Sequence, residues 1–154
     1  MKDYASYAAE LFESGYNCAQ AVAVAFSDMI NLEPKAAAAM ASSFGGGMGR
    51  MREVCGAVSG MLLVAGILYG YDTPGDDESK KALYTEVQAL AARFREQVGS
   101  IICRDILKNP PTDPTPSPRT EEYYKKRPCA RMVLTAGTLL DEFIAAHPLE
   151  EAYE

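Results

Sequence analysis

Apolar positions recur at a helical period along most of the chain. Over residues 3–13, for example, Tyr4, Tyr7, Ala8 and Leu11 fall on one stripe, which is typical of an amphipathic helix. Alternating Val/Ile patterns of the kind that half-buried strands show are absent from the sequence. The pattern therefore predicts an all-α fold, a compact helical bundle.

Capping and helix-breaking residues divide this pattern into separate helices. Gly15 is suited to the left-handed position that ends a helix. Asn17 can cap the next helix, and Pro34 fits the first turn of a third. A longer helix is expected to direct one set of apolar residues inward: Leu83, Val87, Leu90, Ala91, Phe94 and Val98. The predicted helices cover about residues 3–13, 17–30, 34–43, 54–71, 77–98, 100–108 and 128–147.

The segment 54–71 contains no charged residue and reaches the lower length limit of a membrane-spanning helix. Small and polar residues interrupt its start, and no basic residues follow it. A helix that is apolar all round also suits the centre of a bundle, so we expect a central helix and no membrane span. Its glycine pairs, Gly56 with Gly60 and Gly66 with Gly70, predict close approach of another backbone.

Length and breaker residues indicate how the chain is organised. A chain of 154 residues can bury one hydrophobic core without a disulfide or a metal, so we expect one domain over residues 1–154. Five prolines between residues 109 and 119 predict a surface loop, acting as a tether or as a lid or interaction arm. Residues 148–154 are expected to fray.

Charge and the amino terminus exclude some classes of protein. The formal net charge of −6 argues against nucleic-acid binding, which needs a basic face. The short basic stretch of Lys125, Lys126, Arg127 and Arg131 can still bind a local anion. Because the amino terminus shows no secretory signal, we expect a cytoplasmic protein. In that compartment cysteines tend to be catalytic, redox-sensing or metal-binding rather than structural.

The four cysteines share a predicted position near helix starts. Cys18, Cys55 and Cys129 fall in the first turn of a helix, and Cys103 lies in a short helical segment that can begin at Ser100. Unpaired N–H groups and the helix dipole stabilise a thiolate there, and such thiols become nucleophiles. These four residues are therefore the candidate catalytic residues.

Cysteine spacing leaves the kind of chemistry open. No CxxC pair occurs, which excludes a local zinc knuckle or ferredoxin-type motif. Four sulfurs converging from separate helices could still bind a metal ion, an iron–sulfur cluster or another cofactor. Alternatively, the cysteines only fill the core of a helical interaction protein. His147, the single histidine, is expected to cap a helix end at the surface, so a cysteine–histidine dyad has little support.

Two features near Cys55 have both a structural and a functional interpretation. The charged residues just before Cys55 are expected either to be ordinary solvated residues or to act on its thiol through their charge. They are Arg50, Arg52 and Glu53. The segment FGGGMG follows a predicted helix, whereas a dinucleotide-binding motif needs a preceding strand. It is expected to be a connector, with an anion-binding backbone nest or an approach to the thiols as the alternative.

The cysteine pattern resembles a family of redox-active proteins named for the order C, GCAxxG, C, C. The cysteines stand in GYNCAQAV, VCGAVSG, CRDIL and RPCARMV, and the similarity covers roughly residues 2–143. In the central motif Cys55, Gly56, Ala57 and Gly60 match, whereas Val54 stands before the cysteine where the family name places a glycine. The resemblance implies a compact helical protein with thiol redox activity, and it names no substrate.

Together these observations favour a thiol–disulfide redox protein in which two cysteines form a reversible disulfide and the others resolve or relay it. Cys55 is the expected attacking thiolate because of its helix start and the glycines around it. Its partner is open, since four cysteines allow three pairings. A redox partner protein or a small thiol is the expected partner, no cofactor is assigned, and homo-oligomer formation is left open.

Overall fold

A computed structural model describes residues 2–149, and in this range the chain forms helices and no β-strand. The predicted all-α fold is confirmed. One isolated antiparallel bridge joins Val54 to Ile102. The helical elements are α1 (Tyr4–Glu13), α2 (Cys18–Ala25), α3 (Pro34–Ala41), the 3₁₀ turn η1 (Ser42–Phe44), α4 (Gly45–Met48), α5 (Gly56–Tyr69), α6 (Asp77–Val98), α7 (Cys103–Leu107), α8 (Glu121–Lys126) and α9 (Cys129–Ala146).

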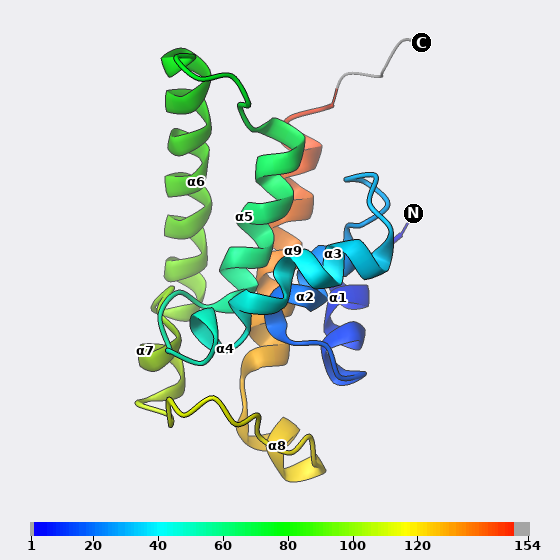
Figure 1. Ribbon diagram of the computed structural model, residues 1–154, viewed down its shortest axis with the longest axis vertical. Coiled ribbons are helices and arrows are strands. Elements are labelled where there is room, and N and C mark those ends of the chain that lie inside the picture. The colour runs from blue at the N-terminus through cyan, green and yellow to red at the C-terminus, as the bar shows by residue number, and fades with distance from the viewer. Residues whose placement is uncertain (1, 150–154) are drawn as a thin grey trace.

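Helices α5 and α9 run side by side through the middle of the bundle (Figure 1). Helix α2 packs against α5 and α9, α1 packs on α9, α3 covers α2, and α6 stands beside α5 and α9. The starts of α5 and α9 lie at the same end of the molecule as α4, α7 and α8 (Figure 1). The largest fully buried side chains are Phe12, Phe26, Phe94, Met61, Leu90, Leu139 and Leu140.

The first glycine pair of α5 lets α2 approach it closely. A Cβ atom built on Gly60 would lie 2.7 Å from the Ala19 carbonyl oxygen, and one on Gly56 would collide with Cys18 Sγ. The same prediction was wrong for the second pair: nothing lies within 4 Å of a Cβ on Gly66, and Gly70 ends the helix.

The buried residues of α5 extend from Gly56 to Ala65 and do not include its last turn. Ile67 in its last turns is 47% exposed, so the helix is not covered on all sides as expected. No helix within residues 2–149 combines the length and the apolar character that crossing a membrane requires.

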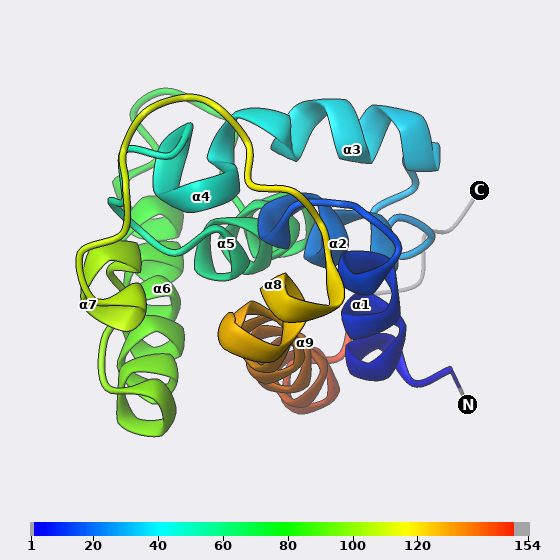
Figure 2. The same cartoon turned by 90° about the horizontal axis from the view of Figure 1, so that it is seen from below.

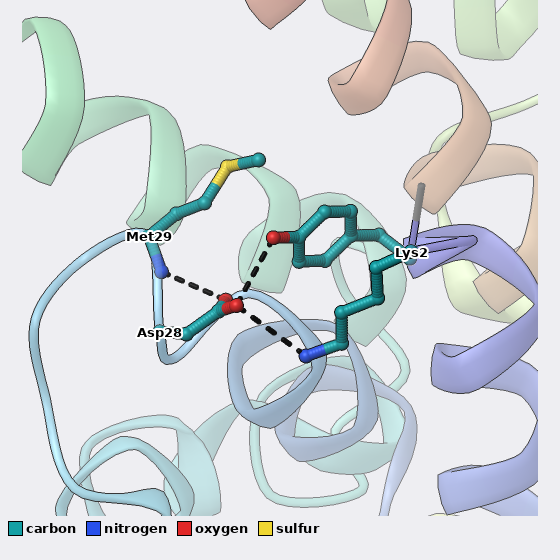
Figure 3. A network of polar contacts seen from close by, with 4 residues as sticks. Lys2, Asp28 and Met29 are labelled. Carbon is teal, nitrogen blue, oxygen red and sulfur yellow. Dashed lines mark hydrogen bonds and ion pairs between the residues drawn. The ribbon is translucent and has the colours of Figure 1, made fainter.

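Helix α2 ends at Ala25, five residues before the predicted end. The carboxylate of Asp28 accepts hydrogen bonds from the Met29 backbone N–H at 2.8 Å and from the Tyr4 hydroxyl at 3.0 Å (Figure 3). The Lys2 Nζ atom lies 3.5 Å from the same carboxylate. A short acidic side chain that bonds to the backbone competes with the helix, so the chain turns here and ties the start of α1 to the end of α2.

Other boundaries follow the sequence closely. Asp3 caps α1, Pro34 begins α3, and α6 spans the predicted residues, although only Leu90 and Phe94 of its inward-facing residues are buried. Helix α8 was not predicted, although Thr120 caps it through a hydrogen bond to the Tyr123 N–H. Most of the predicted fraying tail, from residue 150 on, lies outside the described residues.

The Pro-rich segment 109–119 is a surface loop, as predicted, and most of its residues are exposed. Figure 2 shows it arching from α7 past α4 to α8. The loop therefore borders the end of the bundle at which α5 and α9 begin.

Candidate functional site

All four cysteines line one cavity of about 420 Å³. The cavity is bounded by the starts of α2, α5, α7 and α9, by the glycine-rich segment 45–49 and by the Pro-rich loop. Cysteines separated by 37, 48 and 26 residues in the sequence are thus brought to one place by the fold. We name this space the cysteine cavity.

Each cysteine stands at the start of a helix, as the sequence predicted. Cys18, Cys103 and Cys129 are the first residues of α2, α7 and α9, and Cys55 occupies the N-cap position of α5. Asn17 fixes the start of α2 through a capping box. Its Oδ1 accepts the N–H of Gln20 at 2.9 Å, and the Gln20 side chain accepts the N–H of Asn17 at 3.1 Å.

Backbone pairing brings Cys55 and Cys103 into the same wall of the cavity. The N–H of Cys55 donates to the Ile101 carbonyl at 2.7 Å, and the N–H of Cys103 donates to the Glu53 carbonyl at 2.6 Å. These bonds flank the isolated bridge between Val54 and Ile102. Pairing of these two short backbone segments therefore brings together two cysteines that lie far apart in the chain.

The glycine-rich segment lies against two of the thiols. Gly46 and Gly47 have φ of 68° and 71°, the left-handed region that glycine adopts without strain. A Cβ on Gly47 would lie 2.7 Å from Cys103 Cβ, and the backbone N–H of Gly46 faces the Cys18 thiol. The segment is therefore more than a connector: it approaches the thiols, the alternative that the sequence left open.

Burial controls the acidity of three of the thiols. It raises the pKa of Cys18 and of Cys55, and it raises the pKa of Cys129 from 9.0 to about 12. Opposing contributions are smaller: the N–H groups at the start of α5 lower the pKa of Cys55, and the Arg127 guanidinium lowers that of Cys129. These three thiols are therefore protonated at neutral pH.

Cys18 is electrostatically coupled to each of the other three cysteines. A negative charge on Cys18 raises the pKa of Cys55 and that of Cys129, and a negative charge on Cys103 raises the pKa of Cys18. Cys129 is coupled to all three others as well, but the Cys18 charge is the larger cysteine contribution at both Cys55 and Cys129. Because such coupling falls off with distance, Cys18 lies close to both of these thiols.

Arg52 contacts a cysteine sulfur directly. Its side chain is buried, with 2% of the residue exposed, and its Nη1 lies 3.8 Å from Cys103 Sγ. Its Nε donates to the Pro111 carbonyl at 3.0 Å, which holds the Pro-rich loop. The expectation that Arg52 is solvated or acts on Cys55 was wrong, because the bridge between residues 54 and 102 places it beside Cys103 instead.

Three further arginines line the cysteine cavity. Arg50 and Arg127 donate to the Ser117 hydroxyl at 3.2 and 3.4 Å. Arg119 donates to the Phe12 and Tyr16 carbonyls, each at 3.2 Å, and its guanidinium lies 4.6 Å from the centre of the Phe12 ring.

No pattern in the sequence indicated that Arg119 belongs to the site, because Phe12, which it contacts, lies 107 residues before it. Nor is the basic stretch near residue 127 a single site. Arg127 lines the cavity, whereas Arg131 bonds to the Gln97 carbonyl and Lys126 pairs with Glu122.

All four cysteines are free thiols in this structure. Among residues 2–149, no three His, Cys, Asp or Glu side chains lie close enough together to hold a metal ion. The described part of the chain thus gives no support to the metal or cluster alternative. His147 caps the end of α9, where its Nδ1 lies 2.9 Å from the Phe143 carbonyl oxygen, as predicted for the surface.

Comparison with known proteins bears on this arrangement. No curated protein and no solved structure matches the chain. The sequence profile of the family described as "Putative redox-active protein (C_GCAxxG_C_C)" matches residues 16–143, a range that includes all four cysteines and nearly the whole cavity wall. With most of its length matched and its cysteines gathered in one cavity, the chain belongs to the C_GCAxxG_C_C family of redox-active proteins.

Proposed function

We propose that the protein catalyses thiol–disulfide exchange, with its cavity cysteines cycling between dithiol and disulfide. The observation that carries this proposal is the convergence of four cysteines, each at a different helix start, on one cavity. Cysteines that only fill the hydrophobic core are not expected to line one common cavity. A location in the cytoplasm and a partner that is a small thiol or a redox protein belong to the same proposal.

Cys103 is the proposed attacking cysteine. Its sulfur lies 3.8 Å from the Arg52 guanidinium, and a neighbouring cation stabilises a thiolate. Cys55, which the sequence favoured, is as buried as Cys103, with 6% of the residue exposed against 7%, and this burial raises the pKa of Cys55. What distinguishes Cys103 is its contact with the Arg52 guanidinium. The nucleophile in thiol exchange is the thiolate, so the structure favours Cys103 over Cys55.

Cys18 is the proposed resolving cysteine because a charge on Cys103 raises its pKa, and because it makes the larger cysteine contribution at both Cys55 and Cys129. Its sulfur packs against the backbone of Gly56, and half-burial leaves it accessible from the cavity. A resolving thiol has to reach the attacking sulfur from inside the site, and Cys18 lines the same cavity as Cys103.

The exchange proceeds in two steps that balance in atoms and electrons. The Cys103 thiolate attacks one sulfur of a substrate disulfide, the substrate S–S bond breaks, and the released thiolate takes up a proton. Cys18 then loses its proton and attacks Cys103 Sγ, which releases the second substrate thiol and leaves a Cys18–Cys103 disulfide. The substrate gains two electrons and two protons, and a small thiol or partner dithiol returns them to the protein by the reverse exchange.

Disulfide mapping tests the proposal. Reduced protein is treated with glutathione disulfide, the remaining thiols are blocked by alkylation, and the cross-linked peptides are identified by mass spectrometry. A Cys18–Cys103 disulfide is expected. In the Cys18→Ser variant, a mixed disulfide of glutathione with Cys103 should accumulate because no resolving thiol is present.

The matched control is Cys129→Ser, which removes a half-buried cavity thiol outside the proposed pair. This variant should form the Cys18–Cys103 disulfide as fast as the wild type. Four free thiols in the wild type after treatment would refute the proposal. A disulfide between Cys55 and Cys129 alone would refute the assignment of the pair.

A further inference from the structure

The cysteine cavity carries a strong excess of positive charge. Four arginines line it, and no aspartate or glutamate does, although the chain as a whole has 21 acidic and 15 basic residues. The described lining is therefore positively charged, although the protein as a whole has a negative net charge. The four are Arg50, Arg52, Arg119 and Arg127.

Two of these arginines have buried donor atoms without an acceptor. Within the described residues, Arg50 Nε and Arg52 Nη2 are buried and make no hydrogen bond. Arg52 is 2% exposed and lines the cavity, so the cavity is the space from which an acceptor can approach its guanidinium. A buried charged donor left unpaired is strongly unfavourable, and native proteins rarely retain one without a role.

The acidic residues nearby do not supply the missing hydrogen-bond acceptors. Glu53 pairs with the exposed Arg104 at 2.5 Å. Hydrogen bonds with Thr115 are the main cause of the lowered pKa of Asp113, and Arg50 adds a smaller contribution, but Asp113 is exposed and is not part of the cavity lining. Cys103 contacts the Nη1 atom of Arg52 and leaves Nη2 free.

We propose that the cysteine cavity binds a small molecule through an oxyanion group, a carboxylate, phosphate or sulfate, which accepts hydrogen bonds from Arg52 Nη2 and Arg50 Nε. A planar guanidinium is well matched to such groups. The cavity volume of about 420 Å³ suits a small-molecule ligand. That this anion is the substrate of the thiols rests on the proposed function, whereas its binding does not require the thiols to react.

Two alkylating agents that differ in charge test the inference. Iodoacetate carries a carboxylate, and iodoacetamide is neutral, while both react with the same thiolate. The ratio of their rates at one cysteine therefore cancels the fraction of thiolate and reports attraction of the anion. Rates at Cys103 and Cys18 are measured by mass spectrometry on reduced protein.

In the wild type, the iodoacetate-to-iodoacetamide ratio at Cys103 should exceed that of the urea-unfolded chain by about tenfold, the low end for a charge-assisted hydrogen bond. Inorganic sulfate should slow the iodoacetate reaction by competing for the site. Arg50→Gln and Arg52→Gln should each bring the ratio close to that of the unfolded chain. Because Arg52 also holds Pro111, Arg50→Gln keeps the test valid if Arg52→Gln does not fold.

The matched control is Arg104→Gln, which removes the same charge from an exposed residue outside the cavity. It should leave the ratio unchanged. A wild-type ratio equal to that of the unfolded chain, or an equal drop in Arg104→Gln, would overturn the inference.

The two proposals fail separately. An ordinary ratio in a protein that still forms the Cys18–Cys103 disulfide refutes the anion site alone. A raised ratio in a protein that forms no disulfide supports the anion site and refutes the redox proposal.

Discussion

The close packing of α2 on α5 can be tested with two identical substitutions in one helix. Gly60 and Gly66 both lie inside α5, so replacing either by alanine gains the same helix propensity, roughly 0.5–1 kcal/mol. The two sites differ in their surroundings. A Cβ on Gly60 would lie 2.7 Å from the Ala19 carbonyl oxygen and 3.0 Å from Val22 Cβ, whereas nothing lies within 4 Å of a Cβ on Gly66.

The expected difference follows from these contacts. The atom that a Cβ on Gly60 meets first is backbone, which cannot rotate away, so α2 and α5 have to separate. Forcing an extra carbon into a packed core costs about 1–3 kcal/mol. Gly60→Ala should therefore be less stable than Gly66→Ala by about 1–3 kcal/mol, since the propensity gain cancels between them.

Urea unfolding of the two variants under reducing conditions measures this difference. With an unfolding slope of about 2 kcal/mol per molar, the midpoints should differ by about 0.5–1.5 M. Ala19 follows Cys18 in the chain, so Gly60→Ala should also change the alkylation rate of Cys18, and Gly66→Ala should not. Equal midpoints for the two variants would refute the close approach of α2 and α5 that positions Cys18.

Three further predictions concern the walls of the cavity. Replacing Asn17 by alanine removes the capping box of α2 and should lower the free energy of unfolding in urea by about 1 kcal/mol. Asn17→Asp keeps an acceptor and should lower it less. Equal losses of stability in the two variants would argue against the cap. Because burial raises the pKa of Cys129 to about 12, the rate at which iodoacetamide alkylates this thiol should increase tenfold per pH unit up to pH 10. In the unfolded chain the rate should level off above about pH 9. A plateau at pH 9 in the folded protein would contradict the burial of Cys129. Arg119→Ala should speed hydrogen exchange of residues 109–119, because the loop loses its hydrogen bond to α1. Arg131→Ala should not, because Arg131 bonds to the Gln97 carbonyl instead. Unchanged exchange in Arg119→Ala would show that other contacts hold the loop.

Much of the fold could be predicted because its signals are local. Asn17, Pro34 and Gly15 mark helix ends through their own side chains and backbone preferences, and they do so here. The early end of α2 was missed because the carboxylate of Asp28 competes for the backbone and is held by Tyr4 from another helix. Helix α8 was missed although it begins at a capping threonine, because it is a six-residue segment between a Pro-rich loop and Pro128.

The sequence by itself determined that the protein is helical and that its four cysteines stand at helix starts, because periodicity, capping and first-turn position depend on neighbours along the chain. Only the tertiary structure decided which side chains meet. It buried Cys55, placed the Arg52 guanidinium beside Cys103, and brought Arg119 to Phe12 across 107 residues. The physical reason is that burial and electrostatic contact depend on distances in space, and an apolar stripe or a charged residue in a sequence does not specify what will pack against it.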